Sequence, residues 1–277
     1  MAYPFPRQFK DKVARLPGSD VLRSDAVKSA AMKSLQYPVY ARSLAGSSGV
    51  KKKFIIFGQG RTGSTLLVDL LNSNSSVYCD EELFFYKLLS PARYAEGKSR
   101  LCQAPVYGFK AKIYQLSDVQ RTDPALFMRR LHRNGWTIIH ITRENLLRHS
   151  LSAVLAEQRQ LYQEKGEIDL RAHREKEHVP VELLISEMQQ RERYRRQEAA
   201  VLQDLPHLHV SYEADLSDSA KQQESLNRIF AALGVPGVEV HTSLRRINST
   251  MLRDDVANYD ELASALDSNG YERFLHA

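Results

Sequence analysis

The segment Phe54–Ser73, FIIFGQGRTGSTLLVDLLNS, constrains the fold of this chain more than any other segment. Its first four residues are apolar and predict a buried strand, and the glycines that follow allow a tight turn. Four leucines then fall on one face of an amphipathic helix: Leu66, Leu67, Leu70 and Leu71. A helix N-terminus after such a turn binds anions, because its free backbone N–H groups and positive dipole end point at the bound group. The segment therefore predicts a phosphate-binding loop.

One position in this loop indicates which phosphate compound it suits. Nucleotide triphosphatases have the pattern GxxxxGK[ST], whereas Gly58–Thr65 is GQGRTGST. Ser64 stands at the position of the lysine that reaches the β- and γ-phosphates, so a triphosphate would be poorly held. The positive charge of the loop comes instead from Arg61, two residues before Gly63. We predict a relative of the P-loop proteins that is adapted to a different donor.

The same loop resembles that of a known family. GRTGSTLLVDLLNS is similar to the 5′-phosphosulfate loop of the sulfotransferases that use 3′-phosphoadenosine 5′-phosphosulfate (PAPS). A second family motif, a strand that ends in Arg with a Ser eight or nine residues later, resembles WTIIHITRENLLRHSLSAVLAEQ. Here Arg143 ends the predicted strand, and Ser152 lies nine residues later on the next predicted helix. The chain most resembles bacterial carbohydrate and nodulation-type sulfotransferases, over roughly residues 50–275.

The resemblance implies a donor site built from both motifs, with PAPS as the cofactor and adenosine 3′,5′-bisphosphate as its product. The residues implied for the 5′-phosphosulfate are Gly60, Arg61, Thr62, Gly63, Ser64 and Thr65. Arg143 and Ser152 are implied for the 3′-phosphate, with Ser150 as the alternative serine. Relatives bring a late basic loop to the nucleotide, and Arg245 or Arg246 has that place in this chain.

The catalytic base is also predicted from the resemblance. Carbohydrate-type relatives use a glutamate shortly after the loop helix, in a segment similar to CDEELF here, so Glu82 is the expected base and Glu81 its alternative. Relatives that act on aryl acceptors use a histidine just after a strand lysine, but this chain has Lys112 at the comparable place. Lys110 is then a candidate to stabilise the transferring group. Such a base takes the proton of the acceptor hydroxyl as the new bond forms.

Strands that alternate with helices, each strand nearly all apolar, predict an α/β fold of the P-loop type. We expect three layers, with a central parallel sheet flanked by helices and the active crevice at the carboxyl ends of the strands. Residues 1–50 are predicted to be an N-terminal helical extension and residues 51–277 the sulfotransferase domain. The segment SNSSVYCDEE is predicted to be a polar turn, and Glu164–His178 a charged loop or lid.

Composition narrows the function without deciding it. The 277 residues carry a net charge of +6, which suits a polyanionic donor but also nucleic acid. The densest basic run, RERYRR at 191–196, is interpreted as a solvated helix face, and no nucleic-acid motif is found, so we expect no nucleic-acid partner. The two cysteines have no metal-ligand spacing, and no metal site is predicted. Without a signal peptide or a long apolar run, we expect a cytoplasmic protein with no stable membrane insertion.

Three classes of function therefore remain. A sulfotransferase accounts for the loop, the missing lysine and the Arg143–Ser152 pair together. A P-loop kinase explains the loop but not Ser64, and a non-catalytic nucleotide-binding protein explains only the charge. For the sulfotransferase, the acceptor is a hydroxyl of a carbohydrate or small molecule: a glycan, a lipid headgroup or a small natural product.

Overall fold

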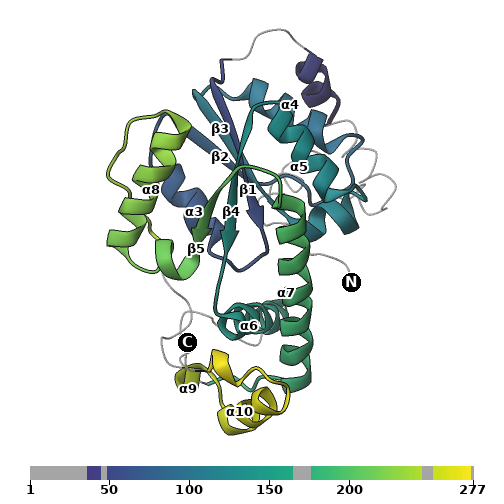
Figure 1. Ribbon diagram of the computed structural model, residues 1–277, viewed down its shortest axis with the longest axis vertical. Helices are drawn as coiled ribbons and strands as arrows, with labels where there is room; N and C mark the ends of the chain where they lie inside the picture. Colours follow the sequence, from purple (N-terminus) through teal and green to yellow (C-terminus); the bar gives the residue numbers. More distant parts are fainter. Residues whose placement is uncertain (1–35, 45–48, 165–175, 245–251, 276–277) are drawn as a thin grey trace.

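The described part of the protein is an α/β fold with one all-parallel sheet. The computed structural model describes residues 36–44, 49–164, 176–244 and 252–275. In these residues five strands pair in the order β2-β3-β1-β4-β5 (Figure 1). The strands are β1 (Lys52–Gly58), β2 (Val77–Glu82), β3 (Val106–Lys112), β4 (Trp136–Thr142) and β5 (His207–Ser211). The sheet has helices on both faces, which confirms the predicted α/β, P-loop-like class.

Each strand is followed by helical structure, as crossovers between parallel strands require. The main helices are α3 (Ser64–Leu71), α4 (Pro91–Leu101), α5 (Pro124–Arg133), α6 (Leu146–Glu164), α7 (Val181–Leu202), α8 (Ser219–Leu233), α9 (Leu252–Asp255) and α10 (Tyr259–Ser268). Shorter helical turns are η2 (Gln115–Val119), η3 (Tyr212–Leu216) and η4 (Glu272–Phe274). A further helix spans residues 36–44.

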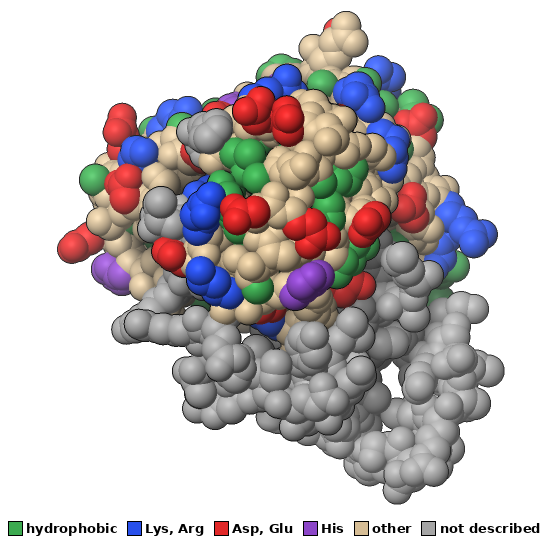
Figure 2. Space-filling view, turned by 90° about the horizontal axis from the view of Figure 1, so that it is seen from below, with side chains coloured by type: hydrophobic (Ala, Val, Ile, Leu, Met, Phe, Trp, Pro, Cys, Tyr) green, Lys and Arg blue, Asp and Glu red, His purple; other side chains and the backbone are tan. Residues whose placement is uncertain are grey.

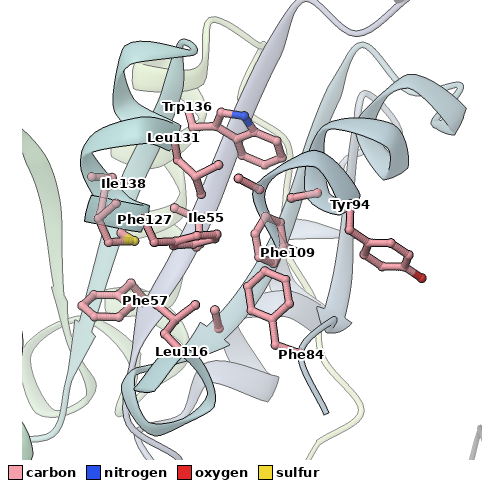
Figure 3. Packing of buried hydrophobic residues seen from close by; sticks show 14 of the residues in the cluster. Ile55, Phe57, Phe84, Tyr94, Phe109, Leu116, Phe127, Leu131, Trp136 and Ile138 are labelled. Atoms are coloured by element: carbon pink, nitrogen blue, oxygen red, sulfur yellow. The ribbon is translucent and has the colours of Figure 1, made fainter. Parts of the chain in front are cut away.

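The apolar run of β1 serves both faces of the sheet. Phe54 and Ile56 pack with leucines of α3 and with residues of α8 such as Phe230. Ile55 and Phe57 point to the opposite face, where α4, α5 and the C-terminal end of α7 supply the core. Figure 3 shows this second cluster, in which Phe109 of β3 packs edge to face against Phe84 and against Trp136 of β4. A strand whose two faces are both covered by helices has no solvent-exposed face, which explains why all four residues of FIIF are apolar.

A third apolar cluster lies beyond the carboxyl end of the sheet. It joins α6, α9, α10 and the N-terminal part of α7, and Leu147, Leu184 and Leu266 are fully buried in it. In Figure 1, α7 runs from the sheet down to α10, so one long helix connects this helical layer to the sheet. Figure 2 views the molecule from below, where Asp and Glu side chains lie around a hydrophobic area and Lys and Arg side chains lie among and beyond them.

Two elements differ from the sequence prediction. The predicted polar turn SNSSVYCDEE contains the edge strand β2, in which Val77 and Cys79 are buried and alternate with polar side chains. The helix α4 was not predicted, because Gly97 in its interior lowers helix propensity. A Cβ atom at Gly97 would lie 2.0 Å from the carbonyl oxygen of Val39, so the glycine lets helix 36–44 pack closely.

The strand and helix of each of the two predicted motifs are present, as β1 with α3 and β4 with α6. Of the predicted N-terminal helical extension, residues 1–50, the structure describes 36–44 and 49–50, and residues 165–175 of the predicted lid lie outside the described residues. Among the helices that are described, none has the length and apolarity needed to cross a bilayer.

Candidate functional site

The glycine-rich loop follows the central strand β1, at the point where the order of the strands in the sheet reverses. The chain runs from β1 through β2 and β3 on one side and through β4 and β5 on the other, so the end of β1 is a topological switch point, where ligands bind in α/β sheets. Gly63 has φ of 85° and caps α3. A Cβ atom there would lie 2.7 Å from the Tyr212 ring, and one at Gly58 2.4 Å from the Ile141 oxygen. Both glycines are therefore required by close approach.

The loop backbone is strained at Arg61. This residue has φ of 68°, a left-handed conformation that costs a non-glycine residue about 1–3 kcal/mol unless neighbours hold it. The carbonyl oxygens on both sides of it accept hydrogen bonds from arginines of other elements. Arg191 Nη1 donates to Gly60 O at 3.0 Å, and Arg143 Nη1 donates to Arg61 O at 3.3 Å. Within the loop, Thr62 Oγ1 donates to Gln59 O at 3.0 Å.

The structure brings the two predicted motifs together. Arg61 Nε donates to Ser152 Oγ at 3.2 Å, across from the loop to the buried face of α6. Arg143 precedes α6 and lies over the Tyr212 ring, 4.8 Å from its centroid. Ser150 is fully buried, and its Oγ has no hydrogen-bond partner among the described residues. The loop, Arg143 and Ser152 thus lie together at the ends of β1 and β4, whereas no described contact joins Ser150 to the loop.

Glu213 occupies the N-terminal end of α6. It accepts hydrogen bonds from the backbone N–H of Glu144 at 2.8 Å and of Asn145 at 3.3 Å. Its carboxylate also lies 3.8 Å from Arg143 Nε. This carboxylate therefore complements the positive end of α6, so Glu213 has a capping role and Tyr212 a packing role.

On the other side of β1, the predicted catalytic residues form a network of acids and lysines. A register shift between Asp80 and Glu82 places Glu82 opposite Lys110 on β3. Lys110 is 5% exposed, donates to Thr65 Oγ1 at 2.9 Å and forms an ion pair with Glu81. Its Nζ also lies 3.6 Å from Glu82 Oε1. Lys110 therefore connects both candidate bases to the loop.

Glu82 and Glu81 differ in their surroundings. The Glu82 side chain is 8% exposed; it lies 2.9 Å from Lys112 Nζ and accepts a hydrogen bond from Gln115 Nε2 at 2.7 Å. The Glu81 side chain is 43% exposed and has Lys110 as its ion-pair partner. The buried carboxylate is thus the better oriented of the two, because two donors fix it in one position.

Sequence analysis missed the contribution of α6 and α7 to the loop. The interpretation of 191–196 as a solvated face is wrong for Arg191, whose side chain is 8% exposed and pairs with Glu187 at 2.7 Å. His149 Nε2 lies 2.7 Å from Gly60 O and 2.6 Å from Arg191 Nη1. Arg195 donates to the carbonyl oxygens of Arg143 and Glu144. The available signal was helical spacing, because Met188, Arg191, Glu198 and Leu202 share the buried face of α7.

The electrostatics around the loop favour a bound anion. Burial, followed by the positive charges of Arg191 and Arg159, lowers the pKa of Arg61. Burial and the charge of Arg191 also lower the pKa of His149 well below its usual range, so the imidazole is neutral. Among the described residues Arg61 forms no ion pair. A cluster of cations that raise one another's energy is stabilised by a group carrying several negative charges.

The donor that the resemblance implies fits this place. The loop offers the N–H groups of a helix N-terminus, and Arg61 supplies a charge whose described side-chain partner is a serine rather than an acid. Arg246 lies in 245–251, outside the described residues, so its predicted role has no structural counterpart here. In the described ranges, no three His, Cys, Asp or Glu side chains are grouped to hold a metal ion.

Comparisons with known proteins show which solved structures have a similar fold. No family model matches the chain, and no curated protein matches its sequence. Among solved structures, sulfotransferase STF9 from Mycobacterium avium is similar with a TM-score of 0.52 and 13% identity, over 94% of this chain and 88% of that one. A sulfotransferase from Alicyclobacillus acidocaldarius aligns with a TM-score of 0.47 and 15% identity, over 84% and 97%. The predicted similarity to bacterial sulfotransferases is confirmed at the level of the fold by the first of these.

Proposed function

We propose that the protein is a PAPS-dependent sulfotransferase, which transfers a sulfuryl group to a hydroxyl of a carbohydrate or small-molecule acceptor. The observation that carries the proposal is the hydrogen bond from Arg61 Nε to Ser152 Oγ, which joins the loop without a P-loop lysine to the second predicted motif. A donor with phosphates at both its 5′ and 3′ positions would need both motifs at once. A triphosphate donor would need neither Ser152 nor Arg143.

The loop would hold the 5′-phosphosulfate of the donor, which supplies an activated sulfuryl group. Gly60, Thr62, Gly63, Ser64 and Thr65 offer backbone N–H groups and hydroxyls at the start of α3, and Arg61 offers its guanidinium. Arg143 and Ser152, with Ser150 as the alternative, would hold the 3′-phosphate. Charge-assisted contacts of this kind position the donor and neutralise the leaving phosphate.

The chemistry would take place on the acid and lysine side of the loop. Glu82 would accept the proton of the acceptor hydroxyl, and its contacts with Lys112 and Gln115 hold it in place for that role. Lys110, which already reaches Thr65 on the loop, would stabilise negative charge on the group in transfer. Glu81 is the alternative base, on the more exposed side of the same lysine.

A P-loop kinase is the second candidate, and one contact favours it. Lys110 brings an ammonium group to Thr65, beside the loop position where Ser64 replaces the lysine of triphosphate-binding loops. If this ammonium serves a triphosphate, ATP binds well despite Ser64. The two candidates therefore differ in one measurable property, the preference between ATP and adenosine 3′,5′-bisphosphate.

Calorimetry without added magnesium tests the proposal. We expect adenosine 3′,5′-bisphosphate to bind more tightly than ATP by at least about tenfold, since two or more charge-assisted contacts to the 3′-phosphate are lost with ATP. Equal or tighter binding of ATP would overturn the sulfotransferase proposal in favour of the kinase. Transfer from labelled PAPS to glycans, lipid headgroups and small hydroxylated compounds then identifies the acceptor.

A further inference from the structure

Arg61 needs help to keep its conformation. In the described residues only Arg61 and Arg121 are non-glycine residues with positive φ, and Arg61 lies at the centre of the loop. Its left-handed backbone directs the side chain toward Ser152 on α6. The two peptide carbonyls that flank Arg61 are each held by an arginine, Arg191 on one side and Arg143 on the other. The conformation is thus imposed by side chains far away in the sequence.

Arg191 contacts the loop from its buried side. Its guanidinium donates to Gly60 O at 3.0 Å through Nη1 and pairs with Glu187 at 2.7 Å through Nη2. Its own backbone oxygen accepts a hydrogen bond from Gln59 Nε2 at 3.3 Å. Gln59 therefore donates a hydrogen bond to Arg191 and Gly60 accepts one from it, and these two bonds fix the peptide that precedes Arg61.

His149 completes this arrangement from α6. Its Nε2, Arg191 Nη1 and Gly60 O form a close triangle with sides of 2.6, 2.7 and 3.0 Å. Because the imidazole is neutral, Nε2 either donates to the carbonyl or accepts from the guanidinium, and both tautomers keep His149 in the triangle. A neutral ring is the only form of histidine that adds no further positive charge beside Arg191.

We propose that Arg191 is a positioning residue for the donor loop. By fixing Gly60 O, it holds Arg61 in the left-handed conformation and so aims the Arg61 guanidinium at the site shared with Ser152. This inference rests on the proposed function, because the affinity it controls is that for the donor. It assigns α7 an indirect role in donor binding, because Arg191 holds the loop from its buried side rather than contacting the donor.

A double-mutant cycle tests the proposal, because glycine adopts positive φ without help. The affinity for adenosine 3′,5′-bisphosphate is measured for the wild type, Arg191→Met, Arg61→Gly and the double variant. Arg191→Met should weaken binding about tenfold in the wild-type background, the value of one charge-assisted hydrogen bond. In the Arg61→Gly background the same change should weaken binding less than about twofold, because the conformation at residue 61 no longer depends on Arg191.

Other roles for Arg191 give other results. If Arg191 acted only through its charge, Arg191→Met would weaken bisphosphate binding by the same factor in both backgrounds, and Arg191→Lys would keep the wild-type affinity. Either result overturns the proposal. We expect Arg191→Lys to fail, because one ammonium does not span Gly60 O and Glu187 as the two guanidinium nitrogens do. Arg193→Met, an exposed arginine on the same helix, is the matched control and should leave affinity unchanged.

Two further outcomes are distinguishable. If the wild type does not bind the bisphosphate, the proposed function fails, and this inference fails with it. If the wild type binds but the cycle is additive, the positioning role alone is overturned. Should Arg191→Met not fold, as judged by thermal denaturation, Arg191→Lys replaces it in the cycle with the same expected non-additivity.

Discussion

The carboxyl end of β1 separates two charged regions of different composition. The lysine side consists of Glu81, Glu82, Lys110 and Lys112 at the ends of β2 and β3, where each ammonium is paired with a carboxylate. The arginine side consists of Arg61, Arg143, Arg191 and Arg195, together with Glu187 and Glu213. There, Arg61 has a serine for its partner rather than an acid.

This difference indicates a division of tasks. A network with equal numbers of acids and lysines has little net charge, but it fixes a carboxylate beside a hydrogen-bond donor, which suits the transfer of one proton. An excess of guanidinium groups suits the capture of a group with several negative charges, for which bidentate contacts give both strength and orientation. The loop lies between them, bonded to Lys110 through Thr65 and to Ser152 through Arg61. Changes on the lysine side should therefore alter turnover, and changes on the arginine side should alter donor affinity.

The largest expected effect is on the lysine side. Glu82→Gln keeps the shape of the side chain and removes its basicity, so turnover should fall by about 10²–10⁴-fold. The dissociation constant of adenosine 3′,5′-bisphosphate should stay within about twofold, because Glu82 contacts lysines rather than the donor. Steady-state kinetics with PAPS and calorimetry measure the two quantities. Glu81→Gln is the matched control: if it loses turnover and Glu82→Gln does not, the base is Glu81. If both variants stay active, neither glutamate is the base, and Lys110 or a histidine of the Glu164–His178 segment becomes the better candidate.

On the arginine side, Arg61→Ala should weaken binding of adenosine 3′,5′-bisphosphate at least about tenfold, since a charge-assisted hydrogen bond contributes about 1.5–3 kcal/mol. Calorimetry measures this, and turnover at saturating PAPS should fall much less. Arg193→Ala removes an exposed arginine of α7 and serves as the control. An unchanged dissociation constant in Arg61→Ala would remove Arg61 from the donor site.

Arg143→Ala sharpens the comparison within the arginine side. If Arg143 binds the 3′-phosphate, the variant should lose about tenfold more affinity for the bisphosphate than for adenosine 5′-phosphate, since the 5′-phosphate is affected only through the contact of Arg143 with the Arg61 carbonyl. The measured quantity is the ratio of the two dissociation constants. Because Arg143 also lies over Tyr212 and near Glu213, a thermal melt must show that the variant is folded. A folded variant that keeps the full preference would contradict the assignment.

The smallest effect distinguishes the two serines of α6. Ser152→Ala removes the partner of Arg61 Nε and should weaken bisphosphate binding about two- to tenfold, as expected for one hydrogen bond. Ser150→Ala should leave affinity within twofold if Ser152 is the 3′-phosphate serine, an estimate of about 0.4 kcal/mol or less. The opposite order of effects would assign the 3′-phosphate to Ser150.

The parts of the protein that were predictable from the sequence are those whose signal is local. The FIIF strand, the glycine turn and the helix after it are adjacent in the chain, and each constrains the next. The edge strand β2 was not predicted, because only Val77 and Cys79 face the core and the acidic residues after them resemble a turn. Its register shift, which brings Glu82 to Lys110, depends on pairing with β3.

The arginine side shows a second reason for failure. Arg191 lies in a basic run that is typical of solvated helix faces, and its partners, Gly60 and His149, come from segments far away in the chain. Nothing near Arg191 in the sequence signals a buried carbonyl. Charged residues of this kind become interpretable only when the fold shows what they contact. The helical pattern from about Val181 to Leu205 predicts α7, but it does not predict the polar contacts on the inner face of this helix.

The order of the strands also has a consequence for how the chain reaches this structure. Every strand pairing joins distant segments: β1 lies between β3 and β4, so Lys53 pairs with Tyr107 and with Trp136. During synthesis the apolar strand Phe54–Phe57 therefore emerges long before either neighbour exists. Sheets built from such non-local pairings fold slowly, and their unpaired apolar strands are prone to aggregate in the meantime. The donor loop, which begins at the end of β1, can take its final shape only after α7 has been made, so binding competence is among the last properties that the nascent protein acquires.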